Sequence, residues 1–321
     1  MNTGKSVRVN MLEKKFGNFT AVNKINFEVN EGEIFGFLGP NGAGKSTTIR
    51  MLCGILSPTS GNGDVGGFDI IKEQEKIKQN IGYMSQKFSL YEDLTVEENI
   101  NFYAGIYRIS AEKKKERKEW VINMAGLGGS RSSRTNTLSG GWKQRLALGC
   151  AILHEPKIIF LDEPTSGVDP ISRKNFWNLI KDMAKNGVTV FVTTHYMDEA
   201  ENCNRIALIY KGDIIALGTP HELKTKFMKE DVLEISMPNP EEWIEKLIGS
   251  IIIKEVALFG AVLHAITEDA QKAVVFLNDL FNKEQIKDYL IREIQPSLED
   301  VFVSLIESYD KAGNPNGTHK S

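Results

Sequence analysis

A glycine-rich turn carries the clearest chemistry in this sequence. In FGFLGPNGAGKSTTIRML, residues 35–52, an apolar strand pattern leads into the turn and a helical pattern follows it. Gly39 to Ser46 match G-x-x-x-x-G-K-[ST], a motif that surrounds phosphate with backbone N–H groups at a helix N-terminus. A glycine turn can fit this motif by chance, but the strand and helix on either side favour a phosphate site.

The motif also assigns roles to its side chains. Gly42 and Gly44 let the backbone fold around anionic oxygens, and Lys45 is expected to reach the β- and γ-phosphates of a nucleotide. Ser46 is expected to ligate Mg²⁺. The residues of the loop that we predict to bind nucleotide are Gly39, Asn41, Gly42, Ala43, Gly44, Lys45, Ser46 and Thr47.

Two adjacent acids follow a second apolar run. In KIIFLDEPTSGVDP, residues 157–170, a buried strand pattern ends at Asp162 and Glu163. Ligand sites of parallel α/β sheets lie at the carboxyl ends of strands. Asp162 is therefore expected to hold Mg²⁺ through water, and Glu163 to orient or deprotonate the attacking water. The two acids could instead lie in a solvated loop, but the phosphate motif upstream favours the catalytic interpretation.

A histidine ends the next strand pattern, in VTVFVTTHYMDEA. His195 in that position could donate a hydrogen bond to the γ-phosphate, whereas a lone histidine at a strand end is more often structural. The phosphate motif and the acid pair elsewhere in the chain favour the functional role. We therefore count His195 with Glu163 and Lys45 as candidate catalytic residues.

The composition is that of an ordinary globular protein. Hydrophobic residues make up 41% and charged residues 25% of the 321 residues, and the net charge of −3 gives no overall basic excess for nucleic acid. No signal peptide is expected, and no apolar run approaches the roughly 18 residues of a membrane span. Cys53, Cys150 and Cys203 lack metal-ligand spacing and are expected to be packing residues in a reducing cytosol.

The elements that position these residues fall into two parts. Up to about residue 225, strand and helical patterns alternate, which predicts a parallel α/β sheet, with a charged helical insertion at about 87–138. The rest reads strand, helix, strand, strand, helix, strand, as in a ferredoxin-like α+β unit, and then one more helix. The predicted domains are residues 1–228 and 229–310, followed by a tail, 311–321, that we expect to be disordered.

Together these motifs resemble an ATP-binding cassette (ABC) ATPase, the nucleotide-binding subunit of an ABC transporter, over residues 5–225. Further segments typical of that family occur once each and in order: a glutamine loop with Gln86, the signature LSGGWKQR from Leu138 to Arg145, and SGVD with Asp169. The resemblance implies a P-loop fold with a parallel core sheet, an N-terminal antiparallel β subdomain and a helical insertion. It also implies ATP and Mg²⁺ as ligands.

The family resemblance extends to individual residues. It implies that Gln86 is a further candidate catalytic residue and Mg²⁺ ligand, which senses Mg²⁺ and the attacking water. It also implies that His195 is the switch histidine and that Asp169 lies in the segment that contacts a second cassette. Phe16 matches the aromatic residue that stacks on adenine.

The signature is expected to act on the nucleotide of a second cassette. In the family, two cassettes close head to tail, so that Ser139, Gly140 and Gly141 of one face the γ-phosphate held by the other. Glycine N–H groups and a serine at a helix start form a suitable anion site. Trp142 stands where the family commonly has glutamine; because the serine and both glycines are intact, we predict a working signature.

The C-terminal segment and the signature resemble those of bacterial drug-exporting cassettes. The resemblance implies an integral membrane permease subunit, a second cassette, most simply another copy of this chain, and in some systems a periplasmic adaptor. It places the chain in the cytoplasm, peripheral on the inner face of the plasma membrane. The alternative is a soluble ABC ATPase acting on the ribosome or on nucleic acid, which the single cassette and the mild acidity disfavour.

The loop KFSLYEDLTV after Gln86 is a candidate docking surface for the permease. Phe88, Leu90 and Tyr91 are apolar residues in a loop, which suits a groove that receives a partner. Ordinary packing within the domain is the alternative for each of them.

Overall fold

The computed structural model describes residues 4–87, 89–228, 230–248 and 250–313. The chain divides into two compact units, Met1–Leu217 and Gly218–Ser321. This boundary lies before helix α8 (Pro220–Phe227), earlier than the expected boundary after residue 228. The difference arises because α8 packs against the last helix, α11 (Leu298–Gly313), and so belongs to the second unit.

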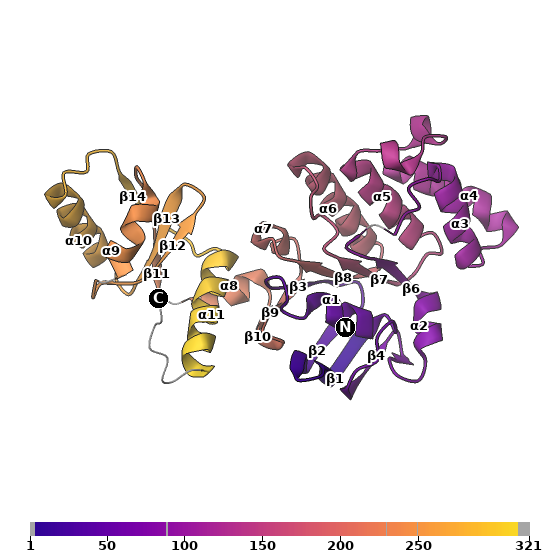
Figure 1. The fold of residues 1–321 in the computed structure, drawn as a ribbon, viewed down its shortest axis with the longest axis horizontal. Helices are drawn as coiled ribbons and strands as arrows, with labels where there is room; N and C mark the ends of the chain where they lie inside the picture. The colour runs from indigo at the N-terminus through magenta and orange to yellow at the C-terminus, as the bar shows by residue number, and fades with distance from the viewer. Residues whose placement is uncertain (1–3, 88, 229, 249, 314–321) are drawn as a thin grey trace. The chain divides into compact units, whose positions relative to one another are not determined.

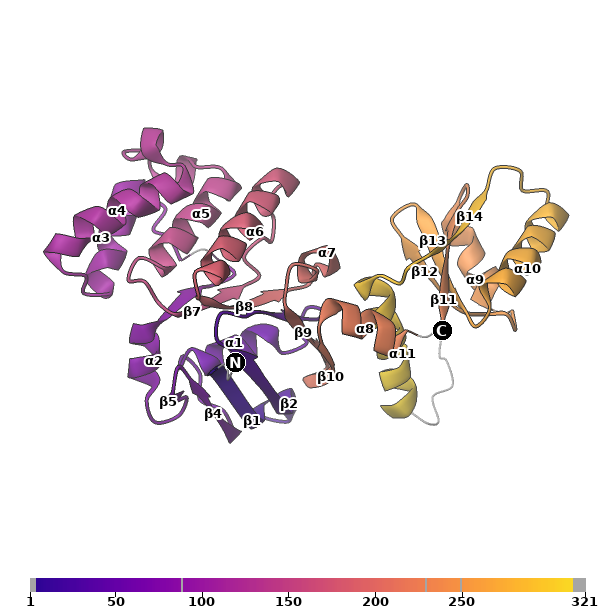
Figure 2. The same cartoon turned by 180° about the vertical axis from the view of Figure 1, so that it is seen from behind.

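The first unit contains two sheets, visible in Figures 1 and 2. The antiparallel sheet has the strand order β2-β1-β4-β5, and the core sheet has the order β10-β9-β3-β8-β7-β6. The strands of the antiparallel sheet are β1 (Lys5–Phe16), β2 (Phe19–Asn30), β4 (Ser60–Val65) and β5 (Phe68–Asp69). The strands of the core sheet are β3 (Ile34–Leu38), β6 (Ile81–Met84), β7 (Ile158–Asp162), β8 (Thr189–Thr194), β9 (Arg205–Tyr210) and β10 (Asp213–Gly218).

Parallel pairing brings the functional strand ends to one edge of the core sheet. Strand β3 pairs in parallel with β8 and β9, and β7 pairs in parallel with β6 and β8. Every residue of β3, β7 and β8 is buried, as expected for continuous apolar runs covered on both faces. The loops that follow β3, β6, β7 and β8 therefore emerge side by side.

Helices of the first unit cover the core sheet and form the insertion. Helix α1 packs against strands of both sheets, so the two sheets share one core. The helices are α1 (Lys45–Leu52), α2 (Gln74–Asn80), α3 (Val96–Ile106), α4 (Ala111–Ala125), α5 (Gly140–Ala151), α6 (Pro170–Lys185) and α7 (Met197–Ala200), with the short 3₁₀ turns η1 (Gly128–Ser130) and η2 (Thr135–Thr137).

The helical insertion has its own small core. Helices α3, α4 and α5 gather at one end of the first unit (Figure 1) and bury a cluster that includes Val96, Ile100, Val121 and Leu146. A capping box between Thr95 and Glu98 begins α3 by satisfying N–H groups that have no helical partner. The charged residues of α4 lie mainly on its exposed side, as the sequence predicts for a solvated helix face.

The second unit is a ferredoxin-like α+β domain with the antiparallel strand order β12-β13-β11-β14. One face of this sheet packs on α9 and α10 through residues such as Leu233 and Phe281. On the other face, His264 of β13 contacts Asp300 of α11. The elements are β11 (Asp231–Ser236), η3 (Pro240–Trp243), α9 (Ile244–Ile248), β12 (Ile253–Phe259), β13 (Val262–Thr267), α10 (Ala270–Lys283), β14 (Leu290–Ile294) and α11.

Helix α11 is longer than the sequence pattern suggests. The expected tail began at residue 311, but the helix continues to Gly313. An ion pair one turn apart, 3.1 Å between Lys311 Nζ and Glu307 Oε2, supports this last turn. The rest of the expected disordered tail lies outside the described residues. Within the described ranges, no helix combines the length and the hydrophobicity that a bilayer crossing requires.

Candidate nucleotide-binding site

The phosphate loop connects β3 to α1 as the sequence predicts. The Nζ of Lys45, the first residue of α1, donates to the carbonyl oxygens of Gly39 (2.7 Å) and Pro40 (3.1 Å) and thus holds the loop closed. Gly44 has a φ of 108°, and a Cβ there would lie 2.4 Å from the carbonyl oxygen of Ala21. Only glycine fits this position without displacing the backbone.

Glu163 is the meeting point of the candidate catalytic residues. Its Oε1 lies 3.0 Å from Lys45 Nζ, and its Oε2 accepts a hydrogen bond of 3.1 Å from Gln86 Nε2. The Nδ1 of His195 lies 3.3 Å from the same Oε2. Glu163 also has a left-handed backbone, with φ 46°, which is uncommon for a residue with a side chain. Three residues from three separate segments therefore converge on the carboxylate of Glu163.

Asp162 is held beside the phosphate loop. Its Oδ1 accepts hydrogen bonds from Ser46 Oγ at 3.0 Å and from Thr193 Oγ1 at 2.8 Å. Burial raises the pKa of this carboxyl and Glu163 raises it further, while the two hydroxyl donors oppose the shift. A hydroxyl and a carboxylate at this spacing provide the oxygen ligands that Mg²⁺ prefers, so these residues fit the ion implied by the sequence.

A cavity of about 410 Å³ lies over the phosphate loop. Phe16 and Phe19 of the antiparallel sheet, both exposed, line this cavity together with Lys45 and Glu163. Exposed aromatic rings beside a phosphate loop offer an apolar face for a planar base. The lining residues are Phe16, Phe19, Ala21, Asn41, Gly42, Gly44, Lys45, Ser46, Thr47, Gln86 and Glu163.

Ala43 does not line this cavity. Its side chain is buried in the core shared by the two sheets, and its N–H donates to the Pro40 carbonyl at 3.2 Å. The motif made every loop residue a candidate, but the Ala43 side chain packs into the core instead of facing the cavity.

The signature residues form a second, separate group. Ser139 is the N-cap of α5 without a side-chain cap hydrogen bond, and Gly140 and Gly141 open the helix. A Cβ on Gly141 would lie 2.4 Å from Ser172 Oγ and 3.9 Å from a carboxylate oxygen of Asp169, so the glycine turn rests against the start of α6. Asp169 caps α6 through a 2.9 Å bond from the Ser172 N–H.

A buried amide links the two groups. Gln144 of α5 is fully buried and donates a 2.8 Å hydrogen bond from Nε2 to the carbonyl oxygen of Pro164, the residue after Glu163. Trp142, in the first turn of the same helix, is exposed. The unusual tryptophan is therefore exposed to solvent in the described chain. The glutamine two residues later connects the signature helix to the loop that begins at Glu163.

Sequence reasoning missed Thr193 and Phe19. Thr193 Oγ1 donates to Asp162 and accepts 2.9 Å from the Glu163 N–H, so it orients both acids. Its only sequence signal is its place at the end of the strand next to β7. Phe19 had a visible signal, since it stands three residues after Phe16 at the same end of the sheet.

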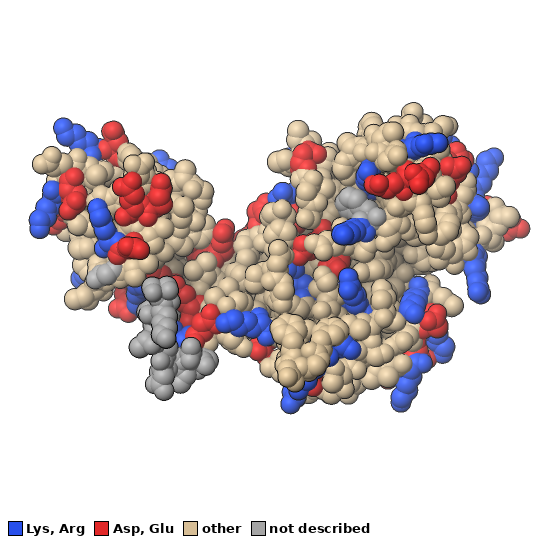
Figure 3. Space-filling view, viewed as in Figure 1, with Lys and Arg blue, Asp and Glu red and all other residues tan. Residues whose placement is uncertain are grey.

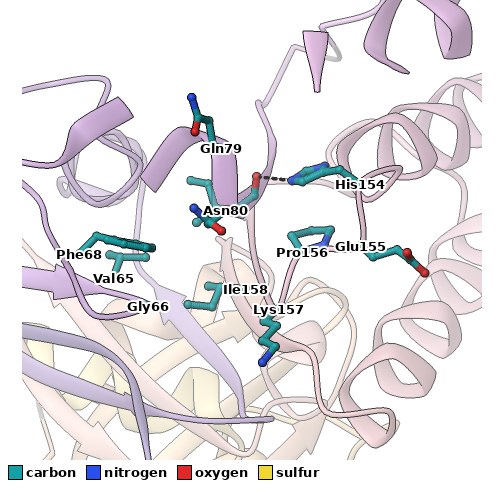
Figure 4. A pocket seen from close by; sticks show the side chains of 11 residues that line it. Val65, Gly66, Phe68, Gln79, Asn80, His154, Glu155, Pro156, Lys157 and Ile158 are labelled. Atoms are coloured by element: carbon teal, nitrogen blue, oxygen red, sulfur yellow. Dashed lines mark hydrogen bonds between the residues drawn. The ribbon is translucent and has the colours of Figure 1, made fainter. Parts of the chain in front are cut away.

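A smaller cavity of about 280 Å³ lies at the amino ends of β6 and β7, on the other edge of the core sheet from the phosphate loop (Figure 4). His154 lines it and bonds the Ile81 carbonyl through Nε2 at 3.1 Å. Burial lowers the pKa of His154 to about 4, so it is uncharged near neutral pH. This cavity lacks the converging charges of the phosphate site.

On the face shown in Figure 3, Lys and Arg side chains are interspersed with Asp and Glu side chains, without a continuous basic surface. The expected absence of a nucleic-acid partner stays a prediction.

A parallel sheet that gathers a phosphate loop and two acids at one edge, beside a helical insertion that bears a second glycine turn, is the architecture of a P-loop nucleotide-binding domain. Two family models agree with this class. A model described as "ABC transporter" matches residues 22–166, and one described as "ATP-binding protein DrrA1-3-like, C-terminal domain" matches residues 218–306.

Known proteins match in the same regions. The probable multidrug ABC transporter ATP-binding protein YbhF of Escherichia coli is 53% identical over 220 residues, which is 68% of this chain but 38% of that protein. The linearmycin resistance ATP-binding protein LnrL of Bacillus subtilis is 36% identical over 298 residues, 92% of this chain and 96% of LnrL. The chain therefore belongs to the family of ABC transporter ATP-binding proteins.

A solved structure supports the fold. The ATP-binding cassette MJ0796, in a dimeric post-hydrolysis state bound to ADP and Pi, superposes with a TM-score of 0.61 at 28% identity. The match covers 66% of this chain and 98% of that chain.

Proposed function

We propose that this chain is the ATP-hydrolysing subunit of an ABC exporter. The observation that carries the proposal is the convergence of Lys45, Gln86 and His195 on the Glu163 carboxylate, next to Asp162 and Ser46. These groups supply phosphate binding, a base and a cation site within one edge of the sheet. The names of the multidrug and linearmycin-resistance relatives support the exporter assignment.

The nucleotide is proposed to lie along the cavity over the phosphate loop. Phe16 offers its exposed ring to the adenine, and the N–H groups of the loop residues that line the cavity, Asn41, Gly42 and Gly44 to Thr47, surround the phosphates. Lys45 then exchanges its contact with Glu163 for the β- and γ-phosphates. Ser46 and Asp162, with Gln86 nearby, would hold Mg²⁺, which would neutralise charge on the phosphate oxygens.

Glu163 is proposed to orient the attacking water and to accept its proton. A carboxylate released from Lys45 is free to accept that hydrogen bond, and Thr193 keeps its backbone in place. His195 lies on the same side of Glu163 as Gln86 and can donate to the γ-phosphate. In these roles Glu163 accepts a proton and His195 donates a hydrogen bond.

The signature turn requires a second cassette in this proposal. Ser139, Gly140 and Gly141 lie against α6 and have no described contact with the chain's own phosphate loop. Unclaimed N–H groups at the start of a helix suit the γ-phosphate of a second bound nucleotide. We therefore propose a head-to-tail dimer of two copies, with Asp169 at the contact, that closes on ATP and opens after hydrolysis.

The transport partner is proposed to be an integral membrane permease subunit, with a periplasmic adaptor in some assemblies. The chain would then lie peripherally on the cytoplasmic face of the plasma membrane. The decisive experiment is affinity purification from mildly solubilised native membranes with identification of the bound proteins. A stoichiometric polytopic membrane protein supports the exporter, whereas ribosomal proteins or nucleic acid would assign the ATPase to a soluble role and refute it.

A further inference from the structure

Arg173 links the start of α6 to the segment that carries His195. It stands in the first turn of α6, and its N–H donates to the carbonyl oxygen of the N-cap Asp169 at 2.9 Å. The guanidinium reaches across to α7, with Nε 3.4 Å from Glu199 Oε1 and Nη1 3.5 Å from Asp198 Oδ2. One side chain thus joins the start of α6 to α7, the helix that follows His195.

The first path from Arg173 to His195 runs through a buried carboxylate. Glu199 is 1% exposed, and its Oε2 accepts a 2.8 Å hydrogen bond from Thr194 Oγ1. The same hydroxyl oxygen accepts a 3.0 Å bond from the Tyr196 N–H. The residues immediately before and after His195 are therefore fixed by a network that ends on Glu199.

The second path runs through an aromatic ring. The guanidinium carbon of Arg173 lies 4.5 Å from the centre of the Tyr196 ring, a cation–π contact. The Tyr196 ring lies 4.1 Å from the His195 imidazole, tilted by 38°. The His195 imidazole thus packs against the Tyr196 ring, and the Tyr196 ring contacts the Arg173 guanidinium.

The chemistry of Glu199 makes a cation necessary at this place. A buried carboxylate without a partner is costly, and removal of one member of a buried ion pair is strongly destabilising. Arg173 is the one ion-pair partner of Glu199 among the residues that the structure describes. A lysine could supply the charge but not the planar contact with Tyr196.

We propose that Arg173 is a positioning residue for His195, acting through Glu199 and Tyr196. The inference rests on the proposed function, because it assigns no contact between Arg173 and substrate. In this proposal the orientation of the His195 imidazole depends on the position of α6, the helix whose N-cap is Asp169. A misplaced imidazole would affect hydrolysis while leaving the phosphate loop, and therefore ATP binding, as it is.

The test compares four variants of the full chain by steady-state ATP hydrolysis: Arg173→Ala, Arg173→Lys, Glu199→Gln and Arg173→Ala/Glu199→Gln. Arg173→Ala is expected to lower kcat by about 10- to 100-fold, the usual cost of a small misplacement of a catalytic group, with little change in KM for ATP. Arg173→Lys should recover part of the loss. Arg173→Ala/Glu199→Gln should also recover part of it, because a glutamine accepts from Thr194 without needing a cation.

The matched control is Lys185→Ala, which removes an exposed cation from the last turn of the same helix. It is expected to leave kcat unchanged. If Arg173→Ala does not fold, the double variant decides: it should keep its KM and show a kcat below that of the unchanged chain, because Tyr196 has lost the guanidinium. A kcat equal to that of the unchanged chain in Arg173→Ala or in Arg173→Ala/Glu199→Gln would overturn the proposal. It would also be overturned if the loss of kcat in the double variant, on a logarithmic scale, were the sum of the losses in Arg173→Ala and Glu199→Gln.

Glu163→Gln distinguishes this inference from the function on which it rests. If that variant hydrolyses ATP as fast as the unchanged chain, the proposed function fails and this inference fails with it. If hydrolysis requires Glu163 but not Arg173, the inference fails alone.

Discussion

The ammonium group of Lys45 lies 3.0 Å from a carboxylate oxygen of Glu163, and both side chains are about 95% buried. This pair joins the group that we propose binds phosphate to the group that we propose activates water. Phosphate and carboxylate are both anions, so a bound γ-phosphate competes with Glu163 for the same cation. In the described structure the Glu163 carboxylate lies beside Lys45. When Lys45 binds phosphate, the carboxylate must take a different position.

Substitution Glu163→Gln is expected to lower ATP turnover on the order of 10² to 10⁴, the usual contribution of a general base. Glutamine has the same shape but accepts no proton, and it no longer competes for Lys45. ATP should therefore bind at least as well, and gel filtration with ATP should show an accumulated dimer. Glu75→Gln, an exposed carboxylate on α2, is the control. Normal hydrolysis by Glu163→Gln would remove this residue from the mechanism.

Ser139→Arg is expected to nearly abolish hydrolysis, whereas Trp142→Gln should retain it. A large cation at Ser139 blocks the helix start that we propose faces the second nucleotide, while Trp142 is an exposed side chain beside that turn. Both variants should still bind ATP, which fluorescent-nucleotide titration checks. Equal losses of activity in the two variants would contradict the prediction that Ser139 is required for hydrolysis and that the Trp142 side chain is not.

The proximity of several candidate site residues could be predicted from the sequence because they follow apolar strand patterns. In a parallel sheet the carboxyl ends of strands lie at the same edge, so Ser46, Asp162 and His195 could be expected to lie close together. Gln86 was expected there only because of the family resemblance. Contacts between side chains of distant segments could not be placed in this way. The bond from Gln144 to Pro164 depends on how α5 packs beside the sheet, which no local pattern encodes.

Element boundaries were less predictable for a similar reason. Helix α8 begins with its own capping box, Thr219 to Glu222, which marks a helix but not the unit to which it belongs. Its packing against α11, distant in the sequence, decides that question.

The loop predicted to dock on the permease contains residues in different environments. Leu90 packs against the core of the helical insertion and Tyr91 is exposed, while Phe88 lies outside the described residues.

Tyr91→Asp should weaken association with the permease and spare basal ATP hydrolysis. Tyr91 is 50% exposed and meets Phe102 edge to face, with ring centres 4.5 Å apart, so the two present an apolar surface. A charge there costs desolvation in an interface but little in water. Co-purification with the membrane subunit and ATPase assays of the isolated chain check the two parts. Loss of hydrolysis without loss of binding would assign Tyr91 to the domain's own packing.

In the second unit, Glu255 of β12 is a half-buried acid facing α11. Burial, and after it the negative charge of Glu307 on α11, raise its pKa to about 7, while Lys311 opposes the shift. Because the folded pKa is above the unfolded value of about 4.3, the folded chain holds this proton more tightly. Its contribution to stability is complete below about pH 4 and is lost as the pH rises through about 7.

Glu255→Gln should therefore stabilise the chain at pH 8 and change it little at pH 5. The gain at pH 8 is expected to be about 1 kcal/mol, well below the full linkage value because the side chain is partly exposed. Urea unfolding of the full chain at both pH values measures the difference, with Glu245→Gln, an exposed acid on α9, as the control. Since other groups titrate equally in both chains, an equal effect of Glu255→Gln at pH 5 and pH 8 would show that Glu255 does not hold a proton at neutral pH.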